Sequence, residues 1–99
     1  MGSGRSHNIA AKRIARKYNT EYNEGRGPDI NTPSVTIEVE TPETVKDGIR
    51  QLQGFRKPVY IAGSNQQAVE AALAATDGTT IGVMDAQGNI VKKSTRKRK

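Results

Sequence analysis

The sequence predicts an α/β domain in which a mixed central β-sheet is flanked by helices. Residues 35–41, VTIEVET, alternate strictly between apolar and polar side chains, which is typical of a β-strand. A segment with helical periodicity follows this strand, and the run PVYIAG at 58–63 then predicts a short buried strand before another helical segment. Strands that alternate with helices in this way favour a sheet with helices packed on its two faces.

The first predicted element is an amphipathic helix in the segment RSHNIAAKRIARKY, with Ser6 as its N-cap. Ala10, Ile14 and Tyr18 share an apolar face of this helix. The opposite face is basic, and it is either simply solvated or in contact with phosphates. It carries Lys12, Arg13, Arg16 and Lys17.

A loop and two strands are predicted next. Residues 19–28 are rich in Asn and Gly and are expected to form a loop. A short strand begins at Asp29, and Thr32-Pro33-Ser34 turns the chain back into the alternating strand. Within that strand the apolar and polar positions face opposite sides: Val35, Ile37 and Val39 on one, and Thr36, Glu38 and Glu40 on the other.

Two further helices have recognisable start and stop signals. Thr41-Pro42-Glu43 predicts a helix start, because a capping hydroxyl precedes proline at the first helical position, and this helix would end near Gly54. After the second strand, Ser64 and Gln67 have capping-box spacing, and Gly78 would close the third helix. The segments TTIGVM and NIV, separated by the turn DAQG, predict a closing hairpin.

Length and composition indicate a small protein with a small hydrophobic core. The chain has 99 residues, no cysteine and a net charge of +6 at pH 7, and only 33% of its residues are hydrophobic. Such a small core favours oligomerisation, so we expect a homodimer. There is no apolar run of about 18 residues and no signal-peptide pattern, which predicts a cytoplasmic protein without membrane contact.

The positive charge is concentrated at the C-terminal end. Since the segment KKSTRKRK offers no apolar side chain for burial, we expect a single domain over residues 1–91 and a flexible basic tail over residues 92–99. The tail either improves solubility or contacts phosphates.

Three carboxylates are predicted to converge. Glu38 and Glu40 emerge on the same face of a strand, and Asp29 would approach them if its segment pairs with that strand. Clustered carboxylates repel unless a cation or a proton compensates, and hard divalent cations such as Mg²⁺ prefer oxygen ligands. A zinc site is disfavoured, because His7 is the single histidine and is expected to be a surface residue. The alternative is a pair of ordinary exposed glutamates on a half-buried strand.

The dipeptide Pro28-Asp29, followed by I-E-V-E at 37–40 and then a helix, resembles the motif of the PD-(D/E)xK nuclease superfamily. That superfamily includes many restriction enzymes and the archaeal Holliday junction resolvases. The resemblance covers most of residues 6–84 and implies a restriction-endonuclease-like core with the order α-β-β-α-β-α-β. It also implies Mg²⁺ or Mn²⁺ as cofactor and DNA as substrate.

Carried over by position, the resemblance implies that Asp29 and Glu38 bind the metal. Glu40 stands where the family usually has lysine. It would then be a metal ligand or a general base for the attacking water, or the domain would have lost catalysis. A third possibility moves the cationic role to the following segment, to Lys46, Arg50 or Lys57.

The expected function is a metal-dependent endonuclease that acts on duplex or branched DNA, with Asp29, Glu38, Glu40 and Gln53 as its catalytic residues. The alternatives are a non-catalytic nucleic-acid-binding module of the same fold and a protein-interaction domain. The basic residues expected to contact DNA are Lys12, Arg13, Arg16, Lys17, Arg26, Lys46, Arg50, Arg56, Lys57, Lys92, Lys93, Arg96, Lys97, Arg98 and Lys99.

Overall fold

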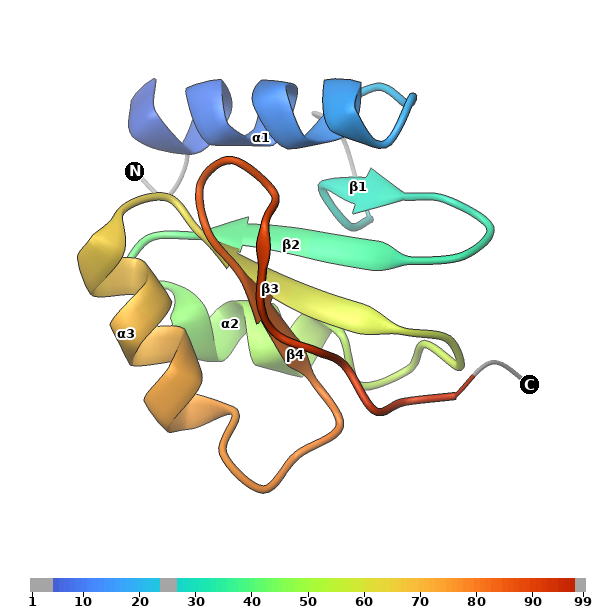
Figure 1. Cartoon of the computed structure of the whole chain (residues 1–99), viewed down its shortest axis with the longest axis vertical. Coiled ribbons are helices and arrows are strands. Elements are labelled where there is room, and N and C mark those ends of the chain that lie inside the picture. The colour runs from blue at the N-terminus through green and yellow to red at the C-terminus, as the bar shows by residue number, and fades with distance from the viewer. Residues whose placement is uncertain (1–4, 24–26, 98–99) are drawn as a thin grey trace.

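The computed structural model describes residues 5–23 and 27–97. It confirms an α/β domain with a five-stranded mixed sheet and three helices (Figure 1). In chain order the elements are α1 (Arg5–Lys17), β1 (Ile30–Asn31), β2 (Thr36–Glu40), α2 (Val45–Gln51), β3 (Val59–Gly63), α3 (Gln66–Ala75), β4 (Gly82–Met84) and β5 (Ile90–Lys92).

The strands lie in the sheet in their chain order, β1-β2-β3-β4-β5. The central strands β2, β3 and β4 are parallel, and α2 and α3 form the crossovers between them. The edge strands β1 and β5 each pair antiparallel with their neighbours. As a result, the carboxyl ends of the three parallel strands meet at one edge of the sheet.

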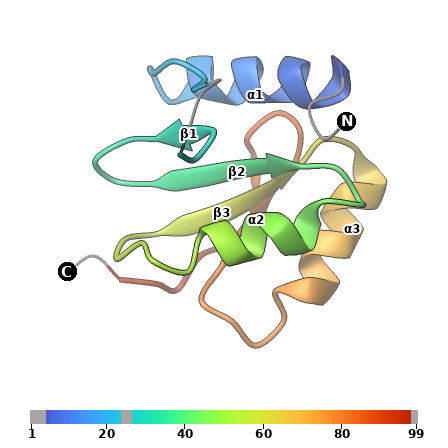
Figure 2. The same ribbon diagram turned by 180° about the vertical axis from the view of Figure 1, so that it is seen from behind.

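Helices cover both faces of the sheet. On one face, α1 contributes Ala11 and Ile14 to a buried cluster with Ile37 and Val39 of β2. On the other face, residues of α2 and α3 pack with Val59, Ile61, Ile81 and Val83. Figure 2 shows α2 crossing that second face, with α3 beside it.

Because both faces are covered, all five residues of β2 are buried, including Glu38 and Glu40. The alternative of ordinary exposed glutamates is therefore wrong. The predicted alternation of side chains between the two faces of the sheet is confirmed. Ile37 and Val39 join the cluster under α1, and the glutamates lie on the opposite face.

The helix starts differ from those predicted. Ser6 is the second residue of α1 rather than the residue before it. Thr44, not Thr41, occupies the N-cap position of α2; its Oγ1 makes no capping bond to the helix and instead accepts from the Thr41 N–H at 2.9 Å. The cap of α3 is Asn65, whose Oδ1 accepts a hydrogen bond from the Ala68 N–H at 2.8 Å.

The expectation of a flexible tail from residue 92 is wrong as far as Arg96. Lys92 belongs to β5, and its Nζ donates to the Thr76 carbonyl at 2.8 Å. Ser94 is buried, and Arg96 donates from Nη1 to the Leu52 carbonyl at 2.6 Å. The domain therefore continues beyond residue 91. Lys93 and Lys97 are exposed, whereas Arg98 and Lys99 lie outside the described residues.

None of the helices in the described part of the chain has the length and apolarity needed to cross a membrane.

Candidate metal centre

Asp29, Glu38 and Glu40 meet in one cluster, as the sequence predicts. Each offers a carboxylate oxygen, and these oxygens lie within 4.8 Å of one another. Glu38 is 3% exposed and Glu40 is 7% exposed, so the cluster is shielded from solvent. Three converging carboxylate oxygens at this spacing are a donor set that could hold a metal ion.

The pairing of β1 with β2 brings Asp29 into the cluster. β1 pairs through Ile30 with Ile37, so Asp29, one residue earlier, lies beside the second half of β2. There its Oδ2 accepts a hydrogen bond from the Val39 N–H at 2.9 Å. The Asp29 carboxylate thus takes the place of a strand carbonyl at the edge of the sheet.

Glu40 is accommodated by a glycine in α2. A Cβ atom at Gly48 would lie 2.6 Å from Glu40 Oε2, closer than such atoms can approach. Glycine in a helix interior is less favourable than alanine by about 1 kcal/mol. Its presence in α2 allows the helix to pack directly on the carboxylate.

Burial in this cluster favours the protonated forms of the two glutamates. Burial raises the pKa of Glu38 to about 9, and the neighbouring charges of Asp29 and Glu40 act in the same direction. Burial also raises the pKa of Glu40 to about 7, although a hydrogen bond from the Thr44 side chain opposes the shift. A bound cation would favour the ionised carboxylates and displace these protons.

His7 joins this cluster, contrary to its predicted position on the surface. It is 7% exposed, and its Nε2 lies 3.3 Å from Asp29 Oδ2. The hydrogen bond with Asp29 raises the pKa of His7. The Tyr22 ring packs edge-on at 5.8 Å between ring centres, and His7 Nδ1 lies 3.3 Å from Asn8 Oδ1. Helical periodicity could have identified this position, since His7 is three and seven residues from the buried Ala10 and Ile14.

The structure does not bring Gln53 into the cluster. Gln53 is exposed, and its side-chain amide donates to the Ile49 carbonyl one turn earlier in α2. Gln51 instead lines a cavity of about 360 Å³ beside Glu38. The other residues lining this cavity are Gly27, Pro28 and Phe55.

The three cations considered as substitutes for the family lysine occupy different surroundings. Lys57 donates to the Asn31 side chain and to the Thr32 carbonyl, in the turn between β1 and β2. Arg50 is exposed and contacts Asp47 at 3.3 Å. Lys46 is exposed on α2.

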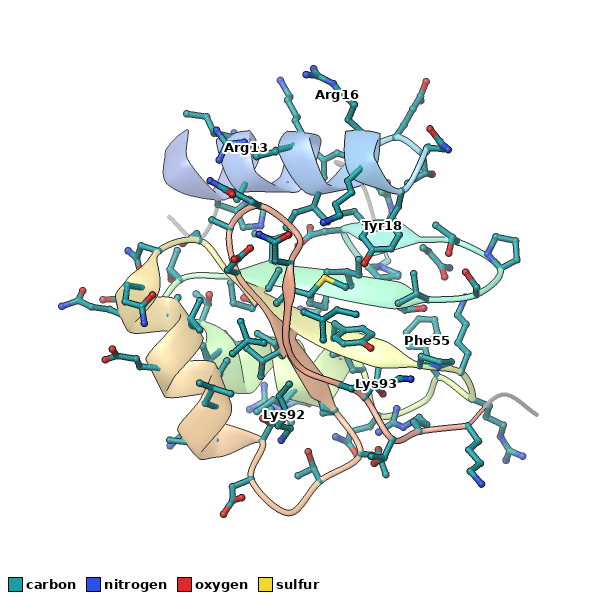
Figure 3. The ribbon with its side chains drawn as sticks, in the orientation of Figure 1. Arg13, Arg16, Tyr18, Phe55, Lys92 and Lys93 are labelled. Carbon is teal, nitrogen blue, oxygen red and sulfur yellow. The ribbon has the colours of Figure 1, made fainter. Side chains whose placement is uncertain are left out.

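Most of the remaining basic residues lie on the exposed face of α1. Arg13 and Arg16 extend from α1 away from the sheet (Figure 3), and Lys12 and Lys17 are exposed on the same helix. This basic face lies on the opposite side of the sheet from α2. Arg56 is exposed shortly after α2, and Arg26 lies outside the described residues.

Comparison of the chain with protein-family models, with curated proteins and with solved structures gives no match.

Proposed function

We propose that this chain is a deoxyribonuclease that uses Mg²⁺ or Mn²⁺ held by Asp29 and Glu38. The observation that carries the proposal is the cluster of three carboxylates, whose oxygens lie within 4.8 Å of one another. Buried carboxylates without a compensating charge are unfavourable, so a cluster built at the carboxyl end of β2 is better suited to a cation than to stability alone.

The topology around the cluster supports the proposed restriction-endonuclease-like assignment. In the resembled family, the Pro-Asp and (D/E)xK segments lie on adjacent strands of a mixed sheet. Here the segment containing Asp29 leads into β1, Glu38 lies in β2, and β1 and β2 are adjacent and antiparallel. The next strand, β3, is parallel to β2 after the crossover through α2.

The proposed roles follow from position. A divalent cation, when bound, supplies Lewis-acid activation of water and neutralises phosphate charge. Asp29 and Glu38 would hold it. Glu40 would act as a third ligand or accept a proton from the attacking water. His7 fixes Asp29 from the side of α1, so it is a positioning residue in this scheme.

The phosphates next to the cut would be contacted from the side of α2. Glu38 and Glu40 lie on that face of the sheet, and Lys46, Arg50 and Arg56 are exposed on α2 and just after it. The basic face of α1 lies on the opposite side and would contact DNA only farther from the cut. These contacts do not read sequence, so the binding is expected to weaken steeply as salt is raised.

The test is cleavage of linear, supercoiled and four-way-junction DNA in Mg²⁺ or Mn²⁺, compared with EDTA. Asp29→Ala and Glu38→Ala should abolish cutting and leave DNA binding in place. Glu70→Ala, which changes an exposed glutamate on α3, is the matched control and should cut normally. Normal cutting by both cluster variants would overturn the site.

A non-catalytic nucleic-acid-binding module is the second candidate. It is favoured by Glu40 in the position of the family lysine and by the engagement of Lys57 with Asn31 and Thr32. This candidate predicts salt-sensitive DNA binding that does not depend on Mg²⁺ and leaves the DNA intact. In either case we propose a homodimer, and sedimentation equilibrium would measure it.

A further inference from the structure

We infer that the cavity beside Glu38 receives an unpaired nucleobase, which stacks against Phe55. This inference rests on the proposed function and narrows it: the substrate would be DNA with an unpaired nucleotide next to the cut, rather than a continuous duplex.

The position of the cavity links it to the metal centre. It lies where the end of α2, the middle of β2 and the segment before β1 meet, and Glu38 belongs both to its wall and to the carboxylate cluster. A ligand in the cavity therefore lies next to any ion held by the cluster. In a nucleic acid, the group adjacent to a phosphate is the sugar and base of the same nucleotide.

The volume and the lining suit a planar, weakly polar group. About 360 Å³ falls within the usual range of small-ligand pockets, which is roughly 300–1,000 Å³. Phe55, Pro28 and Gly27 supply apolar wall, and an aromatic ring provides a surface on which any base can stack. Gln51 is exposed at this wall, and its amide can both donate to and accept from a base edge.

A basic side chain lies beside the aromatic ring, and another follows Phe55 in the chain. Lys57 Nζ lies 5.8 Å from the centre of the Phe55 ring while it donates to Asn31 and Thr32, and Arg56 is exposed. These charges would favour the phosphates that flank a base in the cavity. Phe55 follows α2, on the way to β3 (Figure 3). Since a base within a duplex is stacked and paired, only an unpaired or extruded one could enter.

Binding measured in EDTA tests the cavity without catalysis. Three fluorescein-labelled duplexes of the same sequence are compared: one fully paired, one with a single bulged thymine, and one with an abasic site at the bulge. The wild-type protein should bind the thymine bulge about 5- to 150-fold more tightly than the abasic bulge, as expected for one stacked base. The abasic duplex controls for bending and for phosphate contacts.

Two variants assign this preference to the ring. Phe55 also packs against the core under α2, so Phe55→Leu keeps an apolar side chain there and removes the ring. We expect it to abolish the preference for thymine over the abasic site, whereas Phe55→Tyr should retain it. Leu73→Met changes another partly buried residue of the same core and should leave the preference unchanged.

Equal affinity of the wild-type protein for the thymine and abasic bulges would overturn the inference, as would an unchanged preference in Phe55→Leu. A parallel cleavage assay in Mn²⁺ separates this failure from failure of the proposed function. Cutting without any preference for the base would support the nuclease and overturn the cavity assignment. A Phe55-dependent preference without cutting would support the cavity and overturn catalysis.

Discussion

Replacing Glu38 by glutamine should stabilise the metal-free protein at neutral and alkaline pH. Glu38 is buried, and its pKa is raised to about 9 from an ordinary value of 4.5. The folded protein therefore binds this proton more tightly than the unfolded chain does. Stability must then decrease as the pH rises from about 4.5 to about 9. Glutamine has nearly the same shape, remains neutral, and its amide N–H groups can donate to the neighbouring carboxylates as the single O–H of the protonated acid can donate to one of them.

The size of the stabilisation follows from the shift in the pKa of Glu38. One pKa unit corresponds to about 1.4 kcal/mol, so the upper bound on the stabilisation by Glu38→Gln at about pH 8 is about 5 kcal/mol. Screening by solvent and relaxation of the cluster reduce it, and we expect Glu38→Gln to raise the free energy of unfolding by about 1–3 kcal/mol. At about pH 4, where both states hold the proton, the difference should nearly vanish.

The assay is urea unfolding followed by circular dichroism in EDTA, repeated across this pH range. Glu70→Gln is the matched control on the exposed face of α3 and should change stability by less than about 0.5 kcal/mol. A Glu38→Gln variant that is less stable than the wild type at about pH 8, or a difference that does not change with pH, would refute the reasoning.

Three further predictions concern the same cluster and the C-terminal segment. Gly48→Ala should destabilise the protein by about 1–3 kcal/mol in thermal unfolding, because the new Cβ would lie 2.6 Å from the Glu40 carboxylate. This cost should outweigh the better helix propensity of alanine, and an unchanged or higher melting temperature would contradict it. Arg96→Ala should lower the free energy of unfolding by about 1–3 kcal/mol in urea unfolding, since it removes the hydrogen bonds to the Leu52 and Phe55 carbonyls. Lys97→Ala, at an exposed position, should have no measurable effect. Mn²⁺ at about 100 times its dissociation constant should raise the free energy of unfolding of the wild type by about 2.7 kcal/mol but have a much smaller effect on Glu38→Gln; equal stabilisation of the two proteins would argue against the cluster as the binding site.

The convergence of the carboxylates could be predicted from sequence because it depends on local rules. Alternation along β2 places Glu38 and Glu40 on one face, and the turn at 32–34 returns the chain beside the segment of Asp29. The burial of the glutamates could not be predicted in the same way. It depends on α2 covering that face, and the close contact requires Gly48, which in the sequence is only a glycine within a helical pattern.

The predictions for His7 and the C-terminal segment are wrong for a related reason. Residue type predicts a surface position for His7, although its spacing from Ala10 and Ile14 places it on the buried face of α1. Charge alone predicts a solvated position for Arg96. Its guanidinium instead donates to the carbonyls of Leu52 and Phe55 in the segment that follows α2, and the Leu52 carbonyl also accepts from the Phe55 N–H. Sequence does not show which of several basic residues reaches such a distant acceptor.

The Asp29 carboxylate has two roles. It accepts the hydrogen bond of the Val39 amide beside the edge strand β1, and it belongs to the candidate metal centre. Capture of an ion would change the charge on the group that protects this amide from solvent. Isotope exchange at the single proton of Val39 would therefore report occupancy of the centre without any substrate, label or substitution.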